Sequence, residues 1–351
     1  MGGSSPQAAH PLAGIDVELV SAWIAGRGIG ERPPLRFKRI GNGLSNLTFL
    51  VSDADGRSWV LRRPPLGELL DSAHDVVRES GILTALERTP VPAPRVFGLC
   101  DDRAFSPVPL LLMEYVDGLV IDSLETAERL PPPLPGAIGR SLPTALAKIH
   151  AVDPEATGLD FLSTSRTPYA ARQIRRWRGQ WEGSRTRDLP AVDALADRLW
   201  AAMPPQDEIC VVHGDFHLLN VIVSPANGEV MAVLDWELCT LGNPLADLGS
   251  LLAYWTASAG PAEALIPFGA TPGFPSGEEL VEVYAEASGR SLDALGFWHA
   301  LALWKIAVIV EGVLWRSQND PRNAGSPGAL SAEQVDKLVA RAVAVAAKAG
   351  I

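Results

Sequence analysis

Short apolar runs separated by turn-forming residues occupy the first third of the chain. Three of them, Leu35 to Ile40, Leu47 to Val51 and Trp59 to Arg62, follow one another closely. A fourth, Leu110 to Met113, ends before Asp117-Gly118. Runs of this length between such boundaries are typical of strands joined by tight turns. The pattern predicts a small, mainly antiparallel sheet.

One helix interrupts this sheet, and helices dominate the rest of the chain. From about Ala73 to Glu87 the apolar residues recur at helical spacing. Beyond residue 117 the same periodicity predicts a series of helices. They are Leu134 to His150, Pro168 to Trp181, Ala191 to Met203, Pro244 to Trp255, Glu278 to Ser288, Leu292 to Gln318 and Ala332 to Lys348.

The most apolar stretch runs from Leu292 to Trp315, but His299, Lys305 and Glu311 interrupt it. A buried helix explains this composition better than a membrane span does. The whole pattern favours an α+β fold of two lobes. Residues 15–116 form a small antiparallel-sheet lobe and residues 117–351 a larger, mainly helical lobe, after a disordered tail at residues 1–14.

Composition narrows the class of protein. A chain of 351 residues can build two well-packed lobes, and its net charge of −11 disfavours nucleic acid as a partner. The three cysteines form no C-x-x-C pair, and no basic start precedes an apolar segment. We therefore expect a cytoplasmic enzyme that acts on a small molecule, without a membrane partner. The oligomeric state stays open.

The candidate chemistry lies in the loop His213-Gly-Asp-Phe-His-Leu-Leu-Asn220, which is followed by an apolar hairpin and Asp235-Trp-Glu237. The hairpin turn is Asn227-Gly228. This arrangement is expected to bring Asp215, Asn220 and Asp235 to one end of a short β-ribbon. In phosphoryl transfer, one carboxylate accepts the proton of the attacking hydroxyl, while an amide oxygen and a second carboxylate hold Mg²⁺.

Simpler interpretations apply to the same residues. A lone aspartate in a loop is often a turn former or a helix cap. His213-x-Asp215-x-His217 is also similar to a metal-ligand cluster of a hydrolase. The remaining ligands of such a cluster do not follow in an orderly spacing, which favours the phosphotransferase interpretation.

The loop resembles the H-G-D-x-x-x-x-N catalytic loop of the aminoglycoside phosphotransferase-like kinases. This resemblance covers nearly the whole chain from about residue 15, and Leu61-Arg-Arg-Pro-Pro65 is similar to the subgroup associated with acyl-CoA dehydrogenases. It implies a protein-kinase-like fold that binds ATP, with GTP not excluded, and Mg²⁺. Asp215 would be the catalytic base, and Asn220 and Asp235 would be the metal ligands, with Glu237 a weaker candidate.

The glycine-rich turn after the first strand is a candidate phosphate-binding loop, since glycine lets backbone N–H groups approach phosphate oxygens. By the resemblance, Arg62 replaces the phosphate-anchoring lysine and pairs with Glu79, and Glu114 and Val116 meet adenine. Arginine and lysine are not interchangeable at such a site. The expected nucleotide-binding residues are Gly41, Asn42, Gly43, Ser45, Asn46, Arg62, Glu79, Glu114 and Val116. Asp247, near a helix start, is expected to accept hydrogen bonds from the catalytic loop.

Six arginines in or just beyond the helix around Tyr169 to Trp181 help to indicate which compound accepts the phosphoryl group. Either they form a solvated basic face opposite Ile174, Trp177 and Trp181, or some of them bind an anion. The second interpretation favours an anionic hydroxylated metabolite, such as a hydroxy acid or hydroxyacyl-CoA, over an aminoglycoside-type polycation. A non-catalytic nucleotide-binding regulatory module is a further alternative. The arginines are Arg172, Arg175, Arg176, Arg178, Arg185 and Arg187.

Overall fold

The computed structural model divides the chain into two units. The first is Met1–Asp117 with Ala232–Glu237, and the second is Gly118–Met231 with Leu238–Ile351. The structure describes residue 12 and residues 14–41, 46–66, 75–162, 167–206, 208–255, 271–319 and 331–351. The tail expected at residues 1–14 lies almost entirely outside the described residues.

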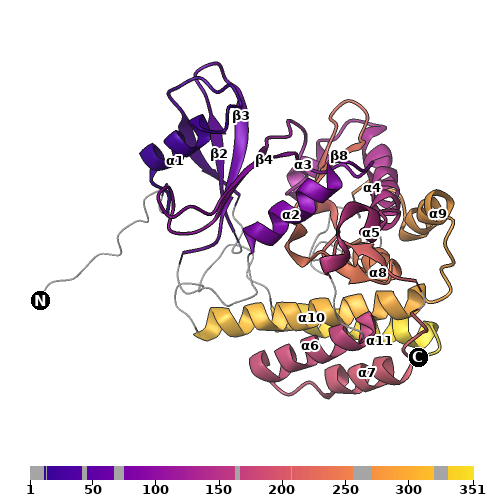
Figure 1. Ribbon diagram of the computed structural model, residues 1–351. Coiled ribbons are helices and arrows are strands. Elements are labelled where there is room, and N and C mark those ends of the chain that lie inside the picture. The colour runs from indigo at the N-terminus through magenta and orange to yellow at the C-terminus, as the bar shows by residue number, and fades with distance from the viewer. Residues whose placement is uncertain are drawn as a thin grey trace, which may run out of the picture. The chain divides into compact units, whose positions relative to one another are not determined.

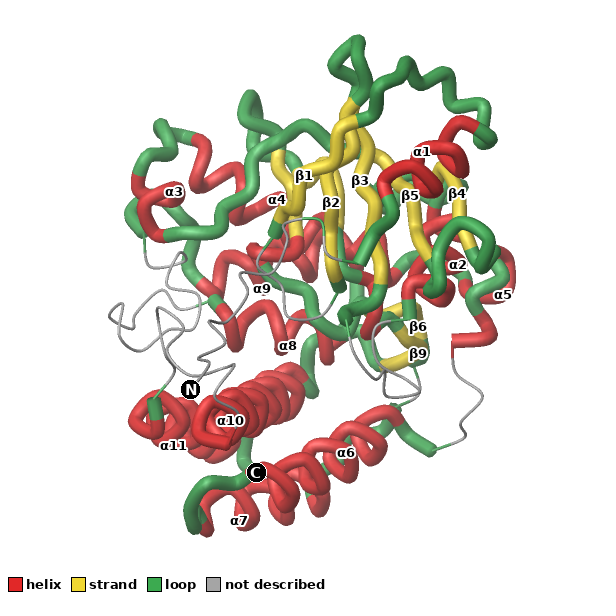
Figure 2. The backbone as a smooth tube through the Cα atoms, turned by 90° about the vertical axis from the view of Figure 1, so that its left-hand side faces the viewer, coloured by secondary structure: helices red, strands yellow, loops and turns green. Residues whose placement is uncertain are grey.

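The first unit contains a five-stranded antiparallel sheet in the order β1-β2-β3-β5-β4 (Figure 2). Alternate residues of β2 (Leu47, Phe49 and Val51) are buried, as the period of a strand requires. Trp23 and Ile24 of α1 belong to the same core. The strands are β1 Arg36–Ile40, β2 Leu47–Ser52, β3 Ser58–Arg63, β4 Val96–Cys100 and β5 Leu110–Glu114, and the helices are α1 Val17–Ala25 and α2 Val76–Leu86.

The segment 232–237 differs from expectation, because the sequence placed it in the larger lobe. It belongs to the first unit. The N–H of Val233 donates to the carbonyl of Pro92 at 2.8 Å. Asp235 is therefore fixed by the unit that carries the sheet, although it follows the catalytic loop in sequence.

The second unit is mainly helical and is built around α10 (Leu295–Asn319), which contacts α6, α8 and α11 (Figure 1). Among the described residues, only α10 is long and apolar enough to cross a membrane, and 78% of its most apolar window is buried inside the structure. It is the buried helix that the sequence predicted. The other helices are α3 Leu124–Glu128, α4 Leu134–His150, α5 Pro154–Thr157, α6 Tyr169–Ser184, α7 Pro190–Ala201, α8 Leu245–Tyr254, α9 Gly277–Ser288 and α11 Ala332–Lys348.

Short strands and 3₁₀ turns flank the loops that contain the predicted site residues. β6 (Cys210–Val212) pairs with β9 (Thr240–Gly242), and β7 (Val221–Val223) pairs with β8 (Val230–Val233). The 3₁₀ turns are η1 Asp160–Leu162, η2 Leu218–Asn220 and η3 Trp236–Leu238. The fold is thus the two-lobed, kinase-like α+β fold expected from the sequence.

Candidate active site

The catalytic loop of the second unit brings together two of the predicted residues. Asp215 follows β6, and Asn220 ends η2 immediately before β7. The side-chain amide of Asn220 donates from Nδ2 to the carbonyl oxygen of Asp215 at 2.9 Å and to Oδ2 at 3.3 Å. Because the nitrogen is used in these bonds, Oδ1 is the atom of Asn220 left for a cation.

Asp247 anchors the start of this loop from the first turn of α8. Its carboxylate accepts the backbone N–H of His213 at 2.6 Å and that of Gly214 at 2.9 Å. Burial alone would raise the pKa of Asp247, but its hydrogen bonds and the nearby His150 and His213 lower that pKa below its ordinary value. The expected bonds to the catalytic loop are therefore present, and they favour the ionised carboxylate.

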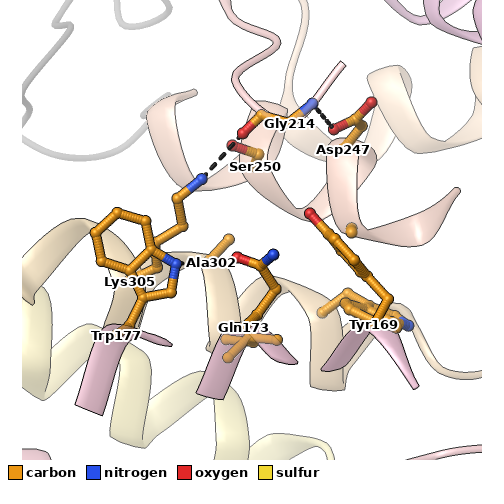
Figure 3. A pocket seen from close by; sticks show the side chains of 11 residues that line it. Tyr169, Gln173, Trp177, Gly214, Asp247, Ser250, Ala302 and Lys305 are labelled. Carbon is orange, nitrogen blue, oxygen red and sulfur yellow. Dashed lines mark hydrogen bonds between the residues drawn. The ribbon is translucent and has the colours of Figure 1, made fainter. Parts of the chain in front are cut away.

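Gly214 has a conformation that suits glycine alone. Its φ is +84°, and an added Cβ would lie 2.6 Å from the carbonyl oxygen of Leu238. The carbonyl of Gly214 accepts a hydrogen bond from Lys305 Nζ at 2.9 Å (Figure 3). The backbone next to Asp215 is thus held by α8 on one side and by α10 on the other.

Asp215 lies close to the side chains of His217, Lys305 and His213. Burial would raise the pKa of its carboxyl, but the hydrogen bond with His217 and the charges of His217, Lys305 and His213 together hold it well below its usual range. The Nε2 of His217 is 3.4 Å from Oδ2 of Asp215, and its ring packs edge-on against Tyr254. The arrangement provides an ionised carboxylate that can orient and accept the proton of a hydroxyl.

Lys305 was not predicted as a site residue, although the sequence shows it as a charged residue inside an apolar helix. An isolated lysine in a buried helix was the available signal. It could not show which partner 91 positions away would accept its hydrogen bond.

The first unit holds the predicted ion pair between Arg62 of β3 and Glu79 of α2, with Nη1 and Oε1 2.5 Å apart. The second arm of the guanidinium, Nη2, lies 3.0 Å from Oδ1 of Asp235. Burial raises the pKa of Glu79 to about 7, although the neighbouring Arg62 opposes this shift. Arg62 therefore links two carboxylates that are far apart in sequence, one at each arm of its guanidinium fork.

Asp235 is the only non-glycine residue of the described chain with a positive φ, at +65°. That conformation costs an aspartate about 1 kcal/mol or more, and it is found preferentially at functional sites. Glu237, two residues later, is partly buried, and its backbone carbonyl accepts a bond from Arg78 at 3.1 Å.

The described part of the glycine-rich turn consists of its two ends. Gly41 has a φ of +74°, and no atom of the described residues outside its chain neighbours lies within 4 Å of where its Cβ would be. Asn46 is buried, and neither its side-chain nitrogen nor its oxygen has a partner among the described residues. Asn42, Gly43 and Ser45 lie outside the described residues. Glu114 ends β5, and Val116 follows two residues later.

The arginines of α6 and its C-terminal end make mostly structural contacts. Arg178 pairs with Asp197, and Arg187 pairs with Asp336. Arg172 donates to the carbonyl of Leu241 at 3.0 Å, and Arg175 covers the ring of Trp200. The opposite face of the helix, with Ile174, Trp177 and Trp181, is buried as predicted. Most of this set matches the simpler interpretation of a basic outer face.

The competing idea of a hydrolase metal centre has no support in the geometry. Among the described residues, no group of three or more histidine, cysteine, aspartate or glutamate side chains could hold a metal ion. His213 and His217 are used within the loop, through bonds to Asp215.

The fold and this catalytic loop define a small-molecule phosphotransferase of the kinase-like class. Residues 36–289 match the family described as the phosphotransferase enzyme family, and the chain therefore belongs to that family. The predicted enzyme class is thereby confirmed.

Two curated relatives are named as acyl-CoA dehydrogenase family members. Member 10 of Mus musculus is 36% identical over 322 residues, which cover 89% of this chain and 29% of that protein. Member 11 of Mus musculus is 32% identical over 343 residues, which cover 95% of this chain and 43% of that protein. The chain thus spans less than half the length of either relative.

Solved structures agree on the fold. One is a Ralstonia eutropha protein that is itself described only by inference as an aminoglycoside phosphotransferase. It is 29% identical to this chain with a TM-score of 0.76, and the match covers 95% of this chain and 97% of that one. Choline kinase from Cryptosporidium parvum has a TM-score of 0.64 at 14% identity, covering 95% and 96%. The aminoglycoside phosphotransferase APH(4)-Ia, solved with ADP and hygromycin B, has a TM-score of 0.58 at 17% identity, covering 90% and 94%.

Proposed function

We propose that the chain transfers a phosphoryl group from ATP, with GTP as an alternative donor, to a hydroxyl group of a small molecule. The observation that carries this proposal is the contact between Asp215 and Asn220 in a loop anchored by Asp247. In this proposal Asp215 is the base, Asn220 and Asp235 are the metal ligands, and Arg62 contacts the nucleotide phosphates.

The residues present fit a Mg²⁺-nucleotide. Asp235 and Asn220 offer a carboxylate and an amide oxygen, which are the hard ligands that Mg²⁺ prefers. The amide of Asn46, which has no partner in the part of the chain that the structure describes, suits a phosphate group or a sugar hydroxyl. Mg²⁺-ATP, when bound, supplies the transferred phosphoryl group and neutralises the charge that develops on it.

The chain's own residues orient the acceptor and move its proton. Asp215 would accept a hydrogen bond from the acceptor hydroxyl and hold its proton on a carboxylate oxygen. The amide of Asn220 limits the rotation of that carboxylate. Arg62 binds Glu79 with one guanidinium arm and Asp235 with the other, so it brings a positive charge next to the proposed metal ligand. Glu114 and Val116 are proposed to meet the adenine edge through their backbone groups.

The acceptor is proposed to be an anionic hydroxylated metabolite, such as a hydroxy acid or a hydroxyacyl-CoA. Lys305 and Arg176 both lie over the ring of Trp177, at 5.5 and 5.2 Å from its centroid, and Lys305 also reaches the catalytic loop. Two cations placed together in this way favour an anionic acceptor over a polycation. The names of the curated relatives also suggest acyl-CoA chemistry. The alternative acceptor is an aminoglycoside-type antibiotic, as in the solved complex with hygromycin B.

Parallel assays separate these acceptors. The purified chain would be incubated with Mg²⁺-ATP and either hydroxyacyl-CoA esters, free hydroxy acids or kanamycin-type compounds, and the phosphorylated product would be measured by mass spectrometry. We expect product from the anionic set. Efficient turnover of the antibiotics, with none of the anionic compounds, would reverse the assignment.

The alternative function is that of a protein without enzymatic activity, a non-catalytic nucleotide-binding module. Asp215, Asn220 and Asp235 are all present, which favours catalysis over a purely binding role. A chain that is stabilised by Mg²⁺-ATP in a thermal-shift assay but transfers phosphate to none of these acceptors would support the binding module. We place the activity in the cytoplasm, where the buried thiols of Cys100, Cys210 and Cys239 stay reduced.

A further inference from the structure

Lys305 makes a contact with the catalytic loop that the proposed chemistry does not yet use. Its ammonium donates to the carbonyl of Gly214 at 2.9 Å, and it reaches that carbonyl from α10 (Figure 3). The N–H of Gly214 is already held by Asp247. The bond from Lys305 therefore adds a constraint on the peptide that follows Gly214, the one that leads into Asp215.

That peptide is held at both of its polar atoms. Its carbonyl oxygen accepts the bond from Lys305, and its N–H, which belongs to Asp215, donates to Nδ1 of His213 at 3.2 Å. A peptide unit is planar, so fixing its oxygen and its hydrogen fixes the direction in which the next Cα leaves. For this peptide, that direction determines where the carboxylate of Asp215 points.

The lysine head itself is held in place. Its Nζ lies 5.5 Å from the ring centroid of Trp177, and the indole N–H of Trp177 donates to Gln173 at 3.0 Å. The charges that face this ammonium are Asp215 and Asp247, which are attractive, and Arg176, which is repulsive. A partly buried ammonium is costly unless hydrogen bonds compensate for it, so a lysine in this apolar helix calls for a specific role.

We propose that Lys305 is a positioning residue for phosphoryl transfer, which fixes the Gly214–Asp215 peptide and thereby aims the carboxylate of Asp215 at the acceptor hydroxyl. The inference rests on the proposed function, since it takes Asp215 as the base. Lys305 acts through the backbone and does not touch the reacting atoms.

A small cavity beside Lys305 allows a conservative test. Its volume is about 30 Å³, and its lining includes Tyr169, Gln173, Ser250 and Lys305 (Figure 3). That is about the room of one or two water molecules. A guanidinium in Lys305→Arg can expand into this space and still donate to Gly214, whereas the apolar head of Lys305→Met cannot donate at all.

The experiment compares Lys305→Met and Lys305→Arg with the control Lys337→Met, which removes a half-buried lysine paired with Glu333. We expect Lys305→Met to lower kcat by about 10- to 100-fold, because small misplacements of a reacting group are this costly. KM for ATP should stay within about threefold, since nucleotide binding is not changed. KM for an anionic acceptor is not a criterion, because Lys305→Met also removes a positive charge beside the loop. Lys305→Arg should recover most of the lost kcat, and Lys337→Met should match the wild type.

Hydrogen–deuterium exchange gives a readout that does not depend on turnover. Peptides that cover residues 213–220 should exchange faster in Lys305→Met, while peptides that cover residues 110–114 of the first unit should not change. If Lys305→Met does not fold, Lys305→Leu, which also lacks a hydrogen-bond donor, takes its place under the same criteria.

The outcomes are distinct. An active wild type together with a folded Lys305→Met variant of equal kcat and equal loop exchange overturns the positioning role. A fall in kcat that Lys305→Arg does not recover, with unchanged loop exchange, overturns it as well. If the wild type transfers no phosphate to any acceptor, the proposed function fails, and the exchange data still decide whether Lys305 fixes the loop.

Discussion

Arg62 and Asp235 are 173 positions apart in sequence, yet Nη2 of the arginine lies 3.0 Å from Oδ1 of the aspartate. The other arm of the same guanidinium binds Glu79. A single positive charge thus serves two carboxylates, and the proposed metal ligand Asp235 already has a partner. Binding of Mg²⁺ at Asp235 must compete with Arg62 or share the carboxylate with it.

The first prediction concerns this cation. Arg62→Ala should weaken Mg²⁺-ATP binding by about tenfold or more, because a charge-assisted hydrogen bond is lost at each arm. Arg62→Lys should keep part of the affinity, since a lysine can hold Glu79 but does not present a fork. Asp235→Ala should abolish the Mg²⁺-dependent part of the binding. Isothermal titration calorimetry with and without Mg²⁺ measures all three.

Arg32→Ala is a matched control, because Arg32 forms an exposed ion pair with Asp55 in the same unit. Exposed pairs contribute little, so its affinity for nucleotide should equal that of the wild type. Equal nucleotide affinity in all four variants would remove Arg62 and Asp235 from the proposed nucleotide site.

The second prediction concerns the base. Asp215→Asn should lower kcat on the order of 10²–10⁴-fold, because a general base typically contributes that much. Binding of Mg²⁺-ATP should be nearly unchanged. Asp197→Asn, which alters an exposed carboxylate paired with Arg178, should leave turnover intact. Wild-type activity in Asp215→Asn would show that another group takes the proton.

The sequence predicted the parts of the fold that carry their own local pattern. The predicted helices Leu134 to His150 and Ala332 to Lys348 have the observed bounds of α4 and α11, because their apolar faces repeat at helical spacing. β4 and β9 were not predicted. β4 contains Gly98 at a shift in register, and β9 has only three residues, so pairing with neighbouring strands, not local pattern, forms them.

The site shows the same division. The spacing of Asp215 and Asn220 within one loop made their contact predictable. The pairing of Arg62 with Glu79 was also predictable, because the two residues lie on neighbouring elements. The left-handed backbone of Asp235 and the contact between Lys305 and Gly214 depend on long-range packing, which a single sequence does not display. The arginines of α6 were correctly placed opposite the tryptophan face, but their individual partners, such as Asp336 for Arg187, could not be inferred.

The third prediction concerns the pH dependence of stability through Asp247. Its pKa is lowered in the folded protein, so the folded state favours the ionised form more than the unfolded state does. The resulting stabilisation is complete above the ordinary aspartate pKa of about 4 and is lost as the pH falls through the lower, folded value. The free energy of unfolding of the wild type should therefore fall below about pH 4.

Asp247→Asn tests this dependence. The amide keeps only one good acceptor for the two N–H groups of His213 and Gly214, so the variant should lose about 3 kcal/mol at neutral pH. Its unfolding free energy should also depend less on pH in the acid range. Urea titrations at several pH values give both quantities, and parallel pH curves for the two proteins would exclude Asp247 as the titrating group.

The last prediction separates two costs of replacing a glycine in the catalytic loop. Gly214 and Gly158 both have a positive φ, of +84° and +74°, but only Gly214 has a backbone atom, the Leu238 oxygen, where a Cβ would go. Gly158→Ala should cost about 1 kcal/mol of stability from the left-handed conformation alone. Gly214→Ala carries the same conformational cost and must in addition displace the loop away from Leu238. It should be less stable than Gly158→Ala and should lose most turnover, because the peptide that leads into Asp215 moves, while Gly158→Ala stays active. Urea unfolding and kcat measured side by side on the two variants test this directly, and equal stability and equal activity of the two would show that the close approach of Gly214 to Leu238 does not constrain the loop.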